Sequence, residues 1–122
     1  MKKPPVTDPR DIFQRVPENP LLDARDFPGI GRINNPAPAF HEGKVILLLS
    51  VLKFHAPNLG QTYVAESEDG LNFTMRDEPF INLRDEPYPF CQTYRHVVDN
   101  RLTPIGDTYY IVTPVIPDTN EG

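Results

Sequence analysis

Residues 44–54, KVILLLSVLKF, form the most apolar run of the chain and decide its fold class. The run is far shorter than the roughly 20 apolar residues that span a bilayer. Its length and its β-branched residues fit a strand covered on both faces better than a helix. The triplet HEG just before it predicts a turn, because Gly43 can adopt a positive φ without strain.

The segments on either side of this run also predict strands joined by turns. Upstream, residues 34–40, NNPAPAF, carry two prolines two positions apart, which excludes a helix but permits an extended chain. Downstream, residues 61–67, QTYVAES, alternate as a strand does, EDG at 68–70 predicts a hairpin turn, and residues 71–75, LNFTM, predict a short strand. Further on, RLTPI and YYIVTPVI flank a turn at Gly106. The 15 prolines among 122 residues also argue against long helices, so the sequence predicts an all-β chain.

The composition narrows the classes of partner. The formal net charge is -5 and the sequence pI is about 5.1, with no basic stripe, so we expect no nucleic-acid partner. Cys91 is the single cysteine and the three histidines stand apart, so we expect no disulfide, no metal site and no cofactor. No apolar segment follows the first lysines as in a signal peptide, and none is long enough to span a membrane. The expected compartment is the cytoplasm.

Two regions differ in composition. Residues 1–33 are rich in Pro, Asp and Arg and predict an extended N-terminal arm, whereas residues 34–122 carry the predicted strands. PDTNEG follows directly after the last apolar strand. Such a strand needs a neighbour on its free edge. We therefore expect a chain truncated at its C-terminus, whose copies could associate as a homo-oligomer.

Candidate site residues are polar groups at the ends of predicted strands. Asp99 lies in RHVVDNRL, two positions before Arg101, so a strand here would place both on one face and Asn100 on the other. The pair could be a structural ion pair, or Asp99 could be a catalytic acid. Asn35 precedes a proline and could be a turn residue, or its amide could bind sugar hydroxyls. His96 could hydrogen-bond a ligand or have a structural role.

Four strings, in order along the chain, resemble one enzyme family. They are NPLLDARDFPG at 19–29, NNPAPAFHEGKVILLLSV at 34–51, YVAESEDGLNF at 63–73 and HVVDNRLTPIGDTYYIVT at 96–113. Together they resemble glycoside hydrolase family 130, the mannoside phosphorylases and related β-mannosidases. The resemblance implies a five-bladed β-propeller with a sugar site at its central channel. At about 40–45 residues per blade, this chain would supply about two blades of an incomplete propeller.

The resemblance also implies roles for single residues. Asp99 falls on the catalytic aspartate of the family's EDPR motif, Arg101 on its arginine, and Asn35 on an asparagine that contacts the sugar. The implied reaction is cleavage of β-mannoside oligosaccharides with inversion, by water or by inorganic phosphate as co-substrate.

The chain departs from the family pattern at several positions. Val98 replaces the glutamate of EDPR, Asn100 its proline, and Ser50 an arginine, while Gln61 stands near where members often carry another arginine. Fewer cations weaken the case for a phosphate site, because an oxyanion needs fixed positive partners. These departures favour hydrolysis, or a degenerate carbohydrate-binding or assembly module without catalysis.

Overall fold

The structure is a computed structural model that describes residues 15–89 and 94–117. Its strands are β1 (Ile30–His41), β2 (Lys44–Lys53), β3 (Ala56–Ser67), β4 (Thr74–Met75), β5 (Tyr94–Val97), β6 (Arg101–Ile105), β7 (Thr108–Val112) and β8 (Val115–Pro117). Two short 3-10 turns, η1 (Ala24–Asp26) and η2 (Leu83–Asp85), are the only helical elements among these residues. The predicted all-β class is confirmed.

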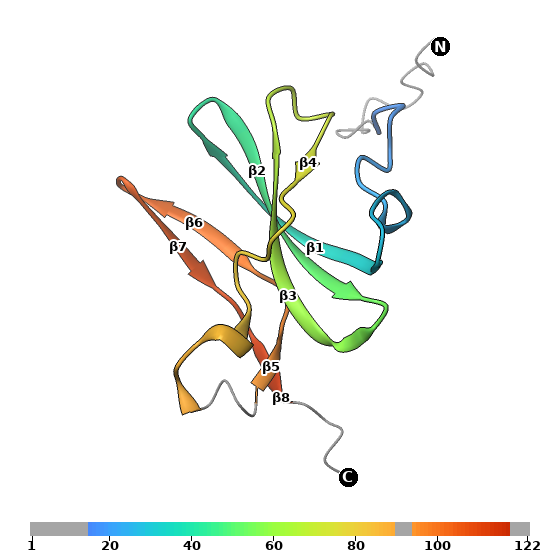
Figure 1. The fold of residues 1–122 in the computed structure, drawn as a ribbon. Coiled ribbons are helices and arrows are strands. Elements are labelled where there is room, and N and C mark those ends of the chain that lie inside the picture. The colour runs from blue at the N-terminus through green and yellow to red at the C-terminus, as the bar shows by residue number, and fades with distance from the viewer. Residues whose placement is uncertain (1–14, 90–93, 118–122) are drawn as a thin grey trace.

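The strands form one large sheet and two strand pairs (Figure 1). β1, β2, β3 and β4 make a four-stranded antiparallel sheet in chain order, while β6 pairs with β7 and β5 with β8. The large sheet has four strands, the number found in one blade of a β-propeller. The described residues form no closed propeller, so the five-bladed ring remains a prediction, and so does the boundary of the N-terminal arm at residue 33.

β2 is flanked on both edges, by β1 and by β3, and is buried on both faces. On one face Leu49 and Val51 pack with Tyr63 under the segment that precedes β1. On the other face Leu48 packs against Val64 beneath the β6–β7 hairpin. The prediction that this apolar run is a doubly covered strand is confirmed.

The predicted turns are also present. Glu42 and Gly43 connect β1 to β2 with φ of 48° and 80°, the positive values that suit the twist of a two-residue hairpin. Between β3 and β4, the carboxylate of Asp69 accepts hydrogen bonds from the backbone amides of Leu71 and Asn72, both at 2.8 Å. These bonds hold the pKa of Asp69 well below its ordinary value of 3.8. Because Leu71 and Asn72 belong to the turn, β4 is only two residues long and not the predicted five.

Residues 109–116, predicted as one run, are divided between two strands. β7 ends at Val112 and β8 begins at Val115, because Pro114 has no amide proton to continue the ladder. Leu102 and Ile111 face each other across the β6–β7 pair and pack onto the large sheet.

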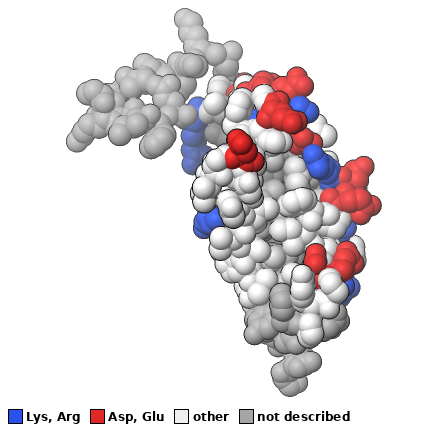
Figure 2. All heavy atoms as spheres, turned by 90° about the vertical axis from the view of Figure 1, so that its left-hand side faces the viewer, with Lys and Arg blue, Asp and Glu red and all other residues white. Residues whose placement is uncertain are grey.

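The apolar side chains on the opposite face of the β6–β7 hairpin are exposed to solvent. The fractional exposure there is 61% for Ile105, 52% for Tyr110 and 69% for Val112. Figure 2 views the molecule from the side on which β6 and β7 lie in Figure 1, and much of this surface carries no charged side chain. Among the described residues, no helix has the length and apolar character to cross a membrane.

Candidate functional site

Asp99 lies in a bend between β5 and β6. Its backbone has φ of 52°, in the left-handed region that few residues adopt without strain, although Asp and Asn do so more readily than most. The prediction that one strand runs through both Asp99 and Arg101 is therefore wrong, since β6 begins only at Arg101. Asn100 between them is fully buried.

The expected ion pair between Asp99 and Arg101 is not formed. The Nη1 group of Arg101 donates instead to the backbone carbonyl oxygens of Asp99, at 3.2 Å, and Asn100, at 3.0 Å. The guanidinium thus clamps the backbone of the bend, and the carboxylate of Asp99 stays available to another partner.

That partner is Asn35. β1 carries a bulge between Asn34 and Ala37, where Asn35 has a left-handed φ of 50°. Its side-chain Nδ2 donates a hydrogen bond to Oδ1 of Asp99. The fold thus brings together two predicted site residues that are 64 positions apart in the chain.

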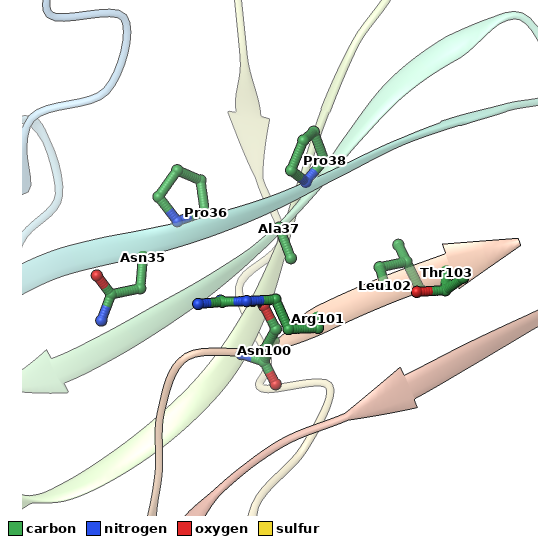
Figure 3. A pocket seen from close by; sticks show the side chains of 8 residues that line it. All are labelled: Asn35, Pro36, Ala37, Pro38, Asn100, Arg101, Leu102 and Thr103. Atoms are coloured by element: carbon green, nitrogen blue, oxygen red, sulfur yellow. Dashed lines mark hydrogen bonds between the residues drawn. The ribbon is translucent and has the colours of Figure 1, made fainter.

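A cavity of about 380 Å³ opens beside this pair, between the bulge of β1 and the start of β6. The residues that line it are Asn35, Pro36, Ala37, Pro38, Asn100, Arg101, Leu102 and Thr103 (Figure 3). In this view the guanidinium of Arg101 extends toward the amide of Asn35. Asp99 itself does not line the cavity and reaches it through Asn35, its hydrogen-bond partner. The amide of Asn35 and the guanidinium of Arg101 both line it, and together they offer a polyol both donors and an acceptor.

Three hydroxyl groups hydrogen-bond the bend that carries Asp99, residues 98–100. Oγ of Ser50 accepts a hydrogen bond from the backbone amide of Asp99 at 3.2 Å, and Oγ1 of Thr62 bonds Oδ1 of Asn100, also at 3.2 Å. Thr113 donates to the carbonyl oxygen of Val98 at 3.0 Å. The sequence prediction missed Ser50 and Thr62 as supporting residues, although Ser50 is the one polar residue inside the apolar run of β2 and could have drawn attention for that reason.

His96 lies apart from this group. Its Nδ1 accepts a hydrogen bond from the backbone amide of Gly60 at 3.0 Å, which ties β5 to β3. It does not line the cavity beside Asp99. The contacts of His96 thus correspond to the structural role that the sequence left open.

A second cavity of about 280 Å³ lies between the large sheet and the β6–β7 hairpin and is mostly apolar. At its rim Arg76 hydrogen-bonds Glu66 at 3.1 Å, which lowers the pKa of Glu66. Within residues 15–89 and 94–117, no cluster of three His, Cys, Asp or Glu side chains is arranged to hold a metal ion. The first cavity is therefore the better candidate for polar chemistry.

The chain is similar to one kind of characterised enzyme. No family model matches it. It is 29% identical over 116 residues to a β-1,2-mannobiose phosphorylase from Listeria innocua, a match that covers 90% of this chain and 30% of that protein. A solved structure of β-1,2-mannobiose phosphorylase from Listeria innocua, in complex with β-1,2-mannobiose, shares the fold with a TM-score of 0.61 at 22% identity. That match covers 80% of this chain and 42% of the other.

The chain therefore spans about a third of the length of the curated relative that it matches. The strings at 19–29, 34–51, 63–73 and 96–113 fall in a chain whose sequence and fold are both similar to a mannobiose phosphorylase. The resemblance to glycoside hydrolase family 130 is confirmed, and it extends over part of the length of such an enzyme.

Proposed function

We propose that this chain carries part of a β-mannoside-cleaving site of the family 130 type, with Asp99 as its proton donor. The observation that carries the proposal is the hydrogen bond from Asn35, which lines the first cavity, to the carboxylate of Asp99 beside it. A glycosidase of this kind needs one carboxylic acid that protonates the leaving oxygen while a nucleophile attacks the opposite face of the sugar.

Two of the other predicted site residues, Asn35 and Arg101, have a role in this proposal. Asn35 orients the carboxyl group of Asp99, and its amide oxygen is available to accept a hydrogen bond from a sugar hydroxyl. Arg101 holds the backbone of the bend and presents its guanidinium to the same cavity. His96 contacts β3 instead, so we assign it no substrate contact.

The nucleophile is inorganic phosphate or water. The curated relative is a phosphorylase, which favours phosphate as the co-substrate, whereas Ser50 and Gln61 stand where the family pattern has cationic side chains. Phosphorolysis with inversion would convert a β-mannoside into α-mannose 1-phosphate and the shortened sugar. The proposed site needs no metal ion and no organic cofactor, and the cytoplasm remains the predicted compartment.

The test is turnover and binding of β-1,2-mannobiose, with and without phosphate. Release of mannose 1-phosphate would support phosphorolysis, and release of mannose alone would support hydrolysis. Asp99→Asn is the matched control variant, because an amide oxygen can still accept the hydrogen bond from Asn35 but the side chain cannot donate the acid proton. A variant that matches the wild type in turnover would rule out Asp99 as the acid.

A second candidate is a carbohydrate-binding or assembly module without catalysis. Val98 and Asn100 replace two residues of the family's acid motif, and the chain spans only a third of its relative. In that case titration with β-1,2-mannobiose would show binding but no product, and Asp99→Asn would leave the affinity nearly unchanged.

Copies of the chain could also associate, because the exposed apolar side of the β6–β7 hairpin would favour contact between them. Association would appear in size-exclusion chromatography as a dimer or larger species.

A further inference from the structure

A row of polar side chains crosses the large sheet beneath the Asp99 bend. Asn34, Ser50 and Thr62 are register partners on β1, β2 and β3, so they share one face of the sheet. Ser50 and Thr62 are fully buried. Two residues further along the same face, Leu48 and Val64 form an apolar cluster instead. One end of this face is therefore polar and the other apolar.

The two hydroxyl groups of this polar row hold consecutive residues of the bend. Ser50 accepts the backbone amide of Asp99, and Thr62 bonds the side-chain oxygen of Asn100. A backbone amide that is withdrawn from water needs a hydrogen-bond acceptor, and the amide of Asp99 finds it in a side chain. Ser50 provides that acceptor at the centre of the sheet.

The polar row does not serve the stability of the sheet well. Within the row, Oδ1 of Asn34 is buried without a hydrogen-bond partner among the described residues. An unpaired buried polar atom is unfavourable, and an apolar side chain at position 34 would avoid it. Ser50 and Thr62 are explained by what they hold, which is the bend that carries Asp99.

We propose that Ser50 is a positioning residue for Asp99. Its hydroxyl fixes the backbone amide of Asp99, and this sets the direction of the side chain so that the carboxyl group meets Nδ2 of Asn35. Thr62 secures the next residue, Asn100, by donating its hydroxyl proton to the side-chain oxygen Oδ1. The functional meaning of this arrangement rests on the proposed function of Asp99, but the arrangement itself can be tested without any ligand.

The test compares Ser50→Ala with the control Ser67→Ala in the whole chain. Ser67 is also buried in this sheet and also accepts a backbone amide, that of Gly70 at 2.9 Å, but it lies at the β3–β4 turn. The readout is hydrogen exchange of the Asn35 side-chain amide, followed by NMR. We expect Ser50→Ala to speed this exchange roughly two- to tenfold, because the bond to Asp99 is lost part of the time. Ser67→Ala leaves the exchange unchanged.

Two further variants keep the test decisive. Ser50→Thr retains the hydroxyl and should restore slow exchange at Asn35. If Ser50→Ala does not fold, Thr62→Val, which frees Asn100, should raise the exchange at Asn35 instead. Unchanged exchange in a folded Ser50→Ala variant, or equal changes in Ser50→Ala and Ser67→Ala, would overturn the positioning role. The exchange measurement does not need a sugar. A wild-type chain that neither binds nor turns over β-1,2-mannobiose would therefore overturn the proposed function and leave the positioning role of Ser50 unaffected.

Discussion

Gly60→Ala tests a close backbone approach, where β3 passes β5. A Cβ atom at position 60 would lie 2.7 Å from the carbonyl oxygen of Val97 and 3.0 Å from two ring atoms of His96. Ordinary contact begins at 3.4 Å, so the carbonyl group would have to move by about 0.7 Å. Val97 is fully buried, and the amide of Gly60 also bonds His96, so β5 cannot retreat without losing packing and a hydrogen bond.

The expected size follows from two opposing effects. Overpacking of this kind destabilises a protein by about 1–3 kcal/mol. Replacing glycine by alanine also restricts the unfolded chain, which restores about 0.4–1 kcal/mol. We therefore expect Gly60→Ala to lower the free energy of unfolding by about 1–2 kcal/mol and the melting temperature by several degrees.

Urea denaturation of the two glycine variants provides the measurement. The matched control is Gly31→Ala, where the new Cβ atom would lie 3.3 Å from the ring of Phe54. That ring is 74% exposed and can move aside, so we expect a change within about 0.5 kcal/mol of the wild type. If Gly60→Ala were as stable as Gly31→Ala, β3 and β5 would not approach each other as described.

Three further perturbations follow from contacts described above. A double-mutant cycle combines Asn35→Gly with Asp99→Gly, because glycine tolerates the positive φ at both positions. Urea denaturation should give a coupling free energy of about 0.5–1.5 kcal/mol between the two side chains. Additive effects of the two substitutions on the free energy of unfolding would contradict the hydrogen bond. The pKa of Asp69 is lower in the folded chain than in the unfolded chain, where it lies near 4. The ionised carboxylate therefore stabilises the fold at pH values above about 4, and this contribution is lost as the pH falls toward the pKa of the folded state. The stability difference between wild type and Asp69→Ala should therefore shrink between about pH 5 and pH 2, and a constant difference would contradict it. Leu49→Ala, at a core position with 2% exposure, should lower the free energy of unfolding by about 2–5 kcal/mol, whereas a loss below about 1 kcal/mol would contradict the burial of β2.

The strands and turns were largely predictable because they depend on local pattern. The apolar run around Leu49, the glycine turn at Gly43 and the hairpin at Gly106 each lie within a dozen residues. The course of residues 109–116 was predicted less well, since Pro114 interrupts a run whose apolar pattern continues.

The site was predictable only as a set of separate residues. Asn35 and Asp99 were candidates from the sequence, and the resemblance implied their roles, but their hydrogen bond depends on a bulge in one strand and a left-handed bend before another. Neither irregularity can be seen in the alternation of apolar and polar residues along a strand. The prediction therefore assumed an uninterrupted strand, in which Asp99 and Arg101 would lie on one face. Ser50 was noticed only as a departure from the family, because a contact across 49 positions is not visible in the sequence.

The polar row has a consequence for how β2 finds its partners during folding. β2 is apolar on both faces, so shifting it by two residues against β1 and β3 would still bury apolar side chains on each side. Ser50 makes one such shift unfavourable. Moving Ser50 into the place of Leu48 would put Leu52 under the amide of Asp99 and the hydroxyl of Ser50 among apolar neighbours. The serine thus adds to the two-residue turn at Glu42 and Gly43, which already fixes the alignment of β2 with β1.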